Sequence, residues 1–217
     1  TILEHNPGVD LGRVRAAFEL ADRAHSGQKR KAGTPYVTHC VAAAQICAEM
    51  GLDEDSIVAA LLHDCIEDTA ITHEDIARQF GAEVADIVEG VTKLTRVQFT
   101  SREDEQMENL RKMLMAMAKD IRVILIKVAD RLHNMRTMEY MVAQKQLEKS
   151  LETMEIYAPI AHRLGLQKVK WELEDLSLKY LDPDGYREII TYLDSKADVL
   201  NEFMSDVKKK ITDRLTE

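Results

Sequence analysis

The residues of this chain best suited to chemistry are histidines and carboxylates that lie in apolar stretches. They are His39, the adjacent pair His63 and Asp64, the acidic pair Glu67 and Asp68, and Asp130. Imidazole nitrogen suits first-row transition metals, and carboxylate oxygen shifts the preference toward harder ions such as Mn²⁺. Burying so many ionisable groups beside apolar residues is costly unless a metal or a ligand compensates for it. The set therefore indicates a catalytic site for a divalent metal; the alternative is a group of solvated helix faces and caps.

The histidine-aspartate dyad and the acidic pair fall within one predicted helix over residues 53–68. Residues four apart lie on the same face of a helix, so Glu67 should share a face with His63. Asp68 should share a face with Asp64 for the same reason. This spacing stacks four polar groups in two rows on a helix that is otherwise apolar.

Asp130 lies on a strongly apolar helix that we expect to begin after Asp120. Asn134 and Thr137 follow Asp130 at i+4 and i+7, so all three share one face. That face offers a metal ligand, an amide and a hydroxyl that can hydrogen-bond a bound molecule. Alternatively, Asn134 and Thr137 are ordinary polar residues at a helix C-terminus and bind no ligand. We interpret His133, on the adjacent face, as structural.

A short basic loop over residues 28–36 precedes His39 and contains Lys29, Arg30 and Lys31. The chain has a formal charge of −9, so an anionic ligand must meet a local cluster of cations or a metal. Arginine can also stack its planar guanidinium on a base. The loop is therefore a candidate for phosphate binding, and a solvated surface turn is the alternative.

The composition narrows the class of protein. A chain of 217 residues with 45% hydrophobic residues, 9 Gly and 4 Pro fits one compact helical domain, with or without a short neighbour. An aromatic content of 5% and the acidic charge argue against nucleic-acid binding. The absence of an apolar run of about 18 residues argues against a membrane span. The cysteines, in apolar stretches and without a C-x-x-C motif, predict reduced core thiols and a cytoplasmic location: Cys40, Cys47 and Cys65.

Apolar periodicity predicts an all-α bundle around the helix that carries Asp130. The predicted helices cover about residues 14–27, 37–50, 53–68, 72–81, 82–94, 101–119, 121–135, 144–164, 166–181 and 186–215. Capping boxes at Thr72 and Ser101 begin two of them. Residues 95–101 are predicted as a loop, and the methionines at 113, 115 and 117 as core filler. A β-strand over residues 122–128 is rejected because no partner strands are apparent.

Three runs of residues carry a resemblance to a known family. They are Arg30–Tyr36 with His39, His63–Thr69, and Lys127–Thr137. Together they resemble the HD hydrolase domain of the long RelA/SpoT homologues. Ala161–Gly165 and Tyr186–Ile189 are similar to the region between the hydrolase and synthetase domains of that family. The resemblance covers nearly the whole chain.

The resemblance implies a Mn²⁺-dependent 3′-pyrophosphohydrolase that converts the alarmone (p)ppGpp, guanosine tetra- or pentaphosphate, to GDP or GTP and pyrophosphate. It implies these metal ligands: His39, His63, Asp64 and Asp130. It implies that acid/base catalysis falls to Glu67 and Asp68. The residues that it implies for nucleotide binding are Arg30, Lys31, Asn134 and Thr137.

The break at residues 182–185, Asp-Pro-Asp-Gly, marks the best boundary candidate. We expect residues 1–182 to form the hydrolase domain with its inter-domain helices, and residues 183–217 to begin a truncated synthetase domain or a linker helix. The chain is then a fragment that lacks synthetase and regulatory domains and does not make the alarmone. Two alternatives stay open: an HD phosphohydrolase that acts on another nucleotide, and a nucleotide-binding regulatory module that controls a synthetase domain.

Overall fold

The computed structural model of the chain describes residues 8–95, 115 and 119–216. Within these ranges the chain is helical and has no β-strand, so the predicted all-α class is confirmed. Most of the predicted loop at 95–101, and most of the helix predicted over residues 101–119, lie outside the described residues. Met115 is 60% exposed, so the prediction that it fills the core is wrong.

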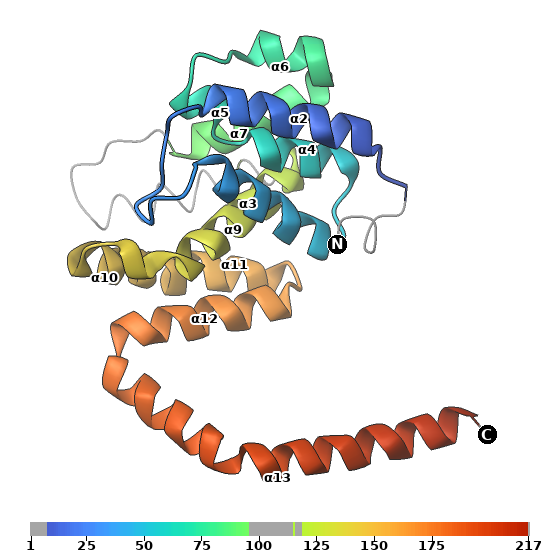
Figure 1. Cartoon of the computed structure of the whole chain (residues 1–217), viewed down its shortest axis with the longest axis vertical. Helices are drawn as coiled ribbons and strands as arrows, with labels where there is room; N and C mark the ends of the chain where they lie inside the picture. The colour runs from blue at the N-terminus through green and yellow to red at the C-terminus, as the bar shows by residue number, and fades with distance from the viewer. Residues whose placement is uncertain (1–7, 96–114, 116–118, 217) are drawn as a thin grey trace.

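Helices from the N-terminal half of the chain form one layer of the bundle, at the top in Figure 1. They are α2 (Leu11–Ala24), α3 (Val37–Glu49), α4 (Glu54–Leu62), α5 (Cys65–Asp68), α6 (His73–Phe80) and α7 (Ala82–Thr95). Local hydrogen bonds fix where they begin. The Asp53 side chain accepts one from Ser56 N at 3.0 Å to cap α4, and Thr72 with Asp75 forms the predicted capping box of α6.

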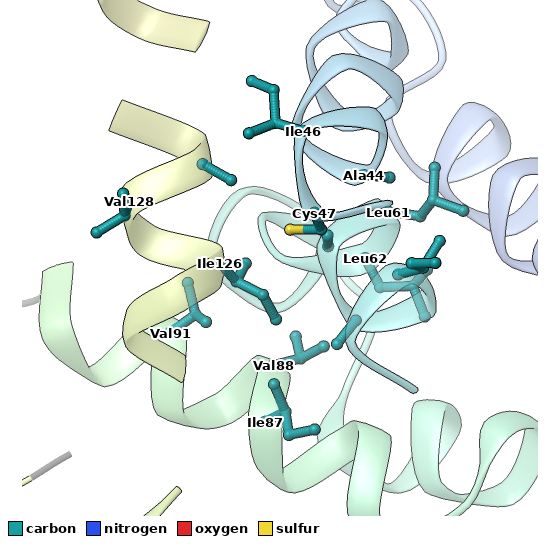
Figure 2. Close-up of a cluster of buried hydrophobic side chains, with 14 of the residues drawn as sticks. Ala44, Ile46, Cys47, Leu61, Leu62, Ile87, Val88, Val91, Ile126 and Val128 are labelled. Atoms are coloured by element: carbon teal, nitrogen blue, oxygen red, sulfur yellow. The ribbon is translucent and has the colours of Figure 1, made fainter. Parts of the chain in front are cut away.

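Helix α9 (Ile121–Arg136) contacts α3, α4, α7 and α12, and so lies at the centre of the bundle as predicted. Asp120 caps it by accepting a hydrogen bond from Arg122 N at 2.9 Å. A Cβ on Gly90 would lie 2.8 Å from Val123, so α7 and α9 pack at a distance that only glycine allows. Figure 2 shows the core between these helices, where α3, α4, α7 and α9 each bury apolar side chains, among them Cys47, Leu62, Val88 and Ile126.

The C-terminal half forms a second layer and one long helix (Figure 1). Its elements are the 3₁₀ turn η1 (Met138–Tyr140), α10 (Ala143–Glu152), the π-helical turn η2 (Thr153–Tyr157), α11 (Ala158–Arg163), α12 (Gln167–Leu181) and α13 (Pro183–Thr216). The predicted helix over 144–164 therefore contains a π turn. Pro159 explains it, because proline lacks an N–H and its ring crowds the carbonyl four residues earlier, which a wider turn relieves.

Helix α13 contacts α12 and extends beyond the bundle in Figure 1. Its start at Pro183 coincides with the predicted boundary, and proline suits the first position of a helix. The apolar side chains of α13 include Ile189, Tyr192 and Leu193, which are 49%, 63% and 47% exposed. The division into two domains at residue 182 stays a prediction.

Two expectations drawn from composition agree with the described residues. Cys40, Cys47 and Cys65 are all buried and none forms a disulfide. None of the described helices is both long and apolar enough to cross a membrane.

Candidate metal centre

The basic loop folds back on itself and leads directly into α3. Arg30 N donates a hydrogen bond to Thr34 O at 2.9 Å, and Gly33 N donates to Arg30 O at 2.8 Å. Gly33 has a φ of +83°, a left-handed conformation that glycine adopts without strain. This turn brings the chain into the first residues of α3, where His39 is completely buried.

The histidine-aspartate dyad lies at a turn between two helices, which corrects the prediction of one helix over residues 53–68. Helix α4 ends at Leu62 and α5 begins at Cys65. Asp64 has φ −96° and ψ −5°, in the sparsely populated bridge region where many active-site residues lie. Asp68 N still donates to Asp64 O at 2.9 Å, so the predicted i,i+4 relationship survives in the backbone.

The structure brings the four predicted metal ligands together. His39 Nε2 lies 3.2 Å from Asp130 Oδ1 and 3.6 Å from Asp64 Oδ2. His63 Nε2 lies 3.0 Å from Asp64 Oδ2 and 4.0 Å from Asp130 Oδ1. One donor atom from each of His39, His63 and Asp130 lies within 4.8 Å of the other two. Two helices, α3 and α9, and the turn between α4 and α5 therefore converge on one point, although they are far apart in sequence.

The state of the imidazoles tests whether this donor set fits a metal. Both Nε2 atoms are buried and neither has a hydrogen-bond partner among the described residues. His63 Nδ1 lies 2.8 Å from Ala60 O. A carbonyl only accepts, so Nδ1 carries the proton and the Nε2 of a neutral ring presents a lone pair to the carboxylates. Lone pairs facing carboxylate oxygens repel unless a cation lies between them, and two imidazoles with two carboxylates suit a divalent transition metal.

The electrostatics of the site also favour a cation. Burial would raise the pKa of Asp130, but the ammonium of Lys127 and the two imidazoles hold it well below its usual value. Burial would lower the pKa of His63, but Asp64 and Asp130 outweigh that effect and raise it to about 9. Burial lowers the pKa of His39 despite the opposing influence of Asp130. Burial would raise the pKa of Asp64, but the two imidazoles hold it below its usual value. Both carboxylates are therefore ionised at neutral pH and attract positive charge, which is a proton on His63 when no metal is bound.

Several residues that sequence reasoning missed hold these groups in place. Lys127 Nζ donates to Asp130 Oδ2 at 2.8 Å, and the i−3 spacing of this pair on α9 is a signal that could have revealed it. The Tyr36 hydroxyl contacts Asp64 Oδ2 at 2.8 Å and Asp68 Oδ2 at 3.2 Å. Nothing in the spacing of Tyr36 and Asp64 predicts that contact. His133, which we interpreted as structural, lies against His39, with their Nδ1 atoms 2.7 Å apart.

One of the two residues predicted for acid/base catalysis, Asp68, contacts the metal centre through the Tyr36 hydroxyl. Tyr36 joins it to Asp64, and its carboxylate is exposed at the rim. Glu67 is half-buried on the same short helix, α5. Both therefore lie one turn beyond the dyad, as the spacing indicates.

The structure joins two of the four residues predicted to bind the nucleotide. Arg30 Nη2 donates to Asn134 Oδ1 at 2.5 Å, and Asn134 Nδ2 donates to Asp130 Oδ1 at 2.5 Å. The Arg30 guanidinium also lies 5.5 Å from the centre of the Tyr36 ring. Lys31 is exposed, and no hydrogen bond or ion pair joins it to the metal centre among the described residues. Thr137 turns its hydroxyl to its own helix and donates to His133 O at 3.1 Å.

Comparison with known proteins identifies the class. The profile of the HD domain matches residues 17–167, and the chain belongs to the HD domain family. The matched region includes every residue predicted for the site.

Individual relatives refine this class. The chain is 49% identical over 212 residues to the probable GTP pyrophosphokinase of Mycobacterium leprae, which covers 98% of this chain and 27% of the relative. It is 47% identical over 211 residues to the bifunctional (p)ppGpp synthase/hydrolase SpoT of Escherichia coli K12, covering 97% of this chain and 30% of the relative. A solved structure described as a metazoan ortholog of SpoT that hydrolyzes ppGpp aligns with TM-score 0.55 and 28% identity, over 79% of this chain and 93% of that one. The chain thus spans less than a third of the length of these bacterial relatives.

Proposed function

We propose that this chain is a (p)ppGpp 3′-pyrophosphohydrolase that uses Mn²⁺ and releases pyrophosphate together with GDP or GTP. The observation that carries the proposal is the pair of buried Nε2 atoms on His39 and His63, which face carboxylates and have no hydrogen-bond partner among the described residues. The relatives support the substrate, since one is named a (p)ppGpp synthase/hydrolase and the metazoan ortholog is described as hydrolysing ppGpp.

The residues that would hold the ion are His39, His63, Asp64 and Asp130. When bound, a divalent cation supplies Lewis-acid activation of a phosphate oxygen and of a water. The mixed imidazole and carboxylate donors favour Mn²⁺ over Mg²⁺, which prefers oxygen ligands. Lys127 donates a hydrogen bond to Asp130 Oδ2, and Asn134 donates one to Asp130 Oδ1. These two bonds fix the orientation of the Asp130 carboxylate toward the imidazoles.

We assign the movement of protons to Glu67 and Asp68. The reaction forms a bond between a water oxygen and phosphorus, breaks the bond from phosphorus to the ribose 3′ oxygen, and delivers a proton to that oxygen. A carboxylate can take the proton from the water and a carboxylic acid can return it to the 3′ oxygen. The exposed rim position of Asp68 suits contact with substrate, and the Tyr36 hydroxyl keeps it beside Asp64.

We assign nucleotide binding to Arg30 and Asn134, with Lys31 and Thr137 beside them. A guanidinium carries five N–H donors, and the bond to Asn134 uses one of them. Arg30 can therefore reach a phosphate or stack on a base while it stays attached to the wall of the site. The exposed Lys31, next to Arg30 in the basic loop, adds local positive charge to a protein whose formal charge is −9.

We also propose that residues 1–182 form the hydrolase domain and that residues 183–217 begin a synthetase domain or a linker. The start of α13 at Pro183 supports this division. The greater length of the relatives supports synthetase and regulatory domains as the natural neighbours of this chain.

The proposal is tested by pyrophosphate release from ppGpp after the protein is stripped of metal and supplied with Mn²⁺, Mg²⁺ or Zn²⁺. We expect turnover of ppGpp with Mn²⁺, little with Mg²⁺, and little release of phosphate or pyrophosphate from a deoxynucleoside triphosphate. Preferred hydrolysis of the deoxynucleotide would make the chain a different HD phosphohydrolase. Binding of ppGpp without turnover would make it a regulatory module.

A further inference from the structure

Two histidine rings from different helices meet beside the metal centre. His39 on α3 and His133 on α9 have their Nδ1 atoms 2.7 Å apart, with ring centres separated by 4.8 Å. Two nitrogens at this distance share one proton, so one ring donates and the other accepts. Which ring donates decides what His39 can do with its other nitrogen.

The other nitrogen of His39 identifies the donor. Its Nε2 is buried, lies 3.2 Å from Asp130 Oδ1, and has no hydrogen-bond partner among the described residues. A ligand to a cation must offer a lone pair at Nε2, so a neutral His39 must carry its proton on Nδ1. His39 therefore donates, and His133 accepts at Nδ1 and carries its own proton on Nε2. The reverse arrangement would put a proton on His39 Nε2, where the lone pair is needed.

We propose that His133 is a positioning residue of the metal centre, whose Nδ1 fixes the tautomer and ring orientation of His39. The proposal rests on the metal role that the proposed function gives to His39. The two imidazole ligands would then be oriented by different kinds of hydrogen-bond acceptor. His63 Nδ1 donates to a backbone carbonyl, Ala60 O, at 2.8 Å, and a carbonyl can only accept. His39 depends instead on a side chain that a single substitution can remove.

Metal binding by variants tests the proposal. His133→Leu replaces the imidazole with an apolar side chain of similar width and so removes the acceptor. His133→Asn retains an acceptor, the amide Oδ1, near the position of Nδ1. The matched control is His73→Asn, because His73 lies on α6 and pairs with Asp86 outside the metal centre. Titration of metal-free protein with Mn²⁺ should show a loss of affinity of about 10- to 100-fold for His133→Leu, the usual scale for a lost outer partner of a metal ligand. His133→Asn should recover most of that loss, and His73→Asn should bind as the unaltered protein does.

Wild-type affinity in His133→Leu would overturn the proposal, as would an equal loss in His133→Asn. A second measurement does not depend on how the variants fold. With ¹⁵N-labelled histidine and Zn²⁺ as a diamagnetic probe, NMR should find the proton of His39 on Nδ1 and that of His133 on Nε2. A proton on His133 Nδ1 would contradict the proposal.

These readouts separate the two claims. A protein that shows this tautomer and this pattern of Mn²⁺ affinity but leaves ppGpp intact would refute the proposed function and retain the role of His133. If the unaltered protein hydrolyses ppGpp and the variant His133→Leu binds Mn²⁺ normally, the proposed function is retained and the role of His133 is refuted.

Discussion

The Tyr36 hydroxyl donates to Asp64 Oδ2 at 2.8 Å, and that same carboxylate oxygen lies 3.0 Å from His63 Nε2. A residue from the loop before α3 thus orients a predicted metal ligand from the turn after α4. The hydroxyl also contacts Asp68 Oδ2 at 3.2 Å, so one group links the metal centre to a predicted acid/base residue. The Tyr36 ring is itself fixed, because it stacks on the buried His25 with ring centres 4.6 Å apart.

Tyr36→Phe should lower kcat for pyrophosphate release by about 10-fold or more, since a hydrogen bond to a charged group is worth about 1.5–3 kcal/mol. Steady-state kinetics on ppGpp with saturating Mn²⁺ measure this. The control is Tyr192→Phe, which removes the hydroxyl of a tyrosine that is 63% exposed on α13. Equal kinetics in the two variants would show that the Tyr36 hydroxyl has no part in catalysis.

Glu67→Gln combined with Asp68→Asn should lower kcat by at least about 10²-fold, the usual scale for acid/base groups. Both changes preserve size and remove the ability to carry a proton. Mn²⁺ content, measured on the same preparation, should stay at the level of the unaltered protein. Loss of the metal would mean that these residues are ligands and that the roles proposed for them are wrong.

Arg30→Ala should weaken substrate binding by about 1–3 kcal/mol, because a charged hydrogen-bond partner is left unpaired. The loss should be larger for ppGpp than for a small phosphoester without a base, and larger than for Arg23→Ala, which removes an exposed arginine of α2. KM and inhibition constants for both substrates provide the comparison. Equal losses of affinity for both substrates would mean that Arg30 contributes only positive charge. No loss of affinity would mean that the basic loop is a solvated surface turn.

The metal-free protein should lose stability as the pH rises from about 6.5 to about 9. His63 has a pKa of about 9 in the folded state, above its ordinary value of 6.5, because Asp64 and Asp130 outweigh burial. A raised pKa stabilises the folded state fully below the unfolded pKa, and this contribution disappears as the pH passes the folded pKa. His39 has a lowered pKa, so its titration affects stability only below about pH 6.5 and does not contribute to this loss.

Thermal unfolding of metal-free protein between pH 6 and 9.5 measures this effect. Saturating Mn²⁺ should abolish most of the pH dependence, because it takes the place of the proton on His63. An unchanged melting temperature across the range for the metal-free protein would contradict the charge state assigned to His63.

The sequence predicted the elements well where local chemistry decides them. The capping box of Thr72 and Asp75 and the cap at Asp120 act between near neighbours, and both form as expected. The turn at His63 and Asp64 was missed because both residues are compatible with a helix and the apolar periodicity continues through it. The π turn of η2 was missed for a similar reason, since one proline gives little sign of how the preceding turn adjusts.

The candidate site was predictable in its residue types and less so in its contacts. Motif resemblance gathered His39, His63, Asp64 and Asp130, which the fold brings within contact distance. The contacts of Tyr36 and His133 join residues 28 and 94 positions apart, and only the packing of α3 against α9 and against the turn after α4 creates them. Spacing along one chain cannot reveal such pairs.

The most direct test of the central claim measures Mn²⁺ content and pyrophosphate release from ppGpp on the same samples of the unaltered protein and of Asp64→Ala. Asp64 Oδ2 lies within 3.6 Å of both imidazole Nε2 atoms, so its loss should remove a ligand and leave the imidazoles without a compensating charge. We predict that the unaltered protein holds Mn²⁺ and releases pyrophosphate, and that Asp64→Ala does neither. Full Mn²⁺ occupancy in Asp64→Ala, or turnover of ppGpp by that variant, would contradict the assignment of this site.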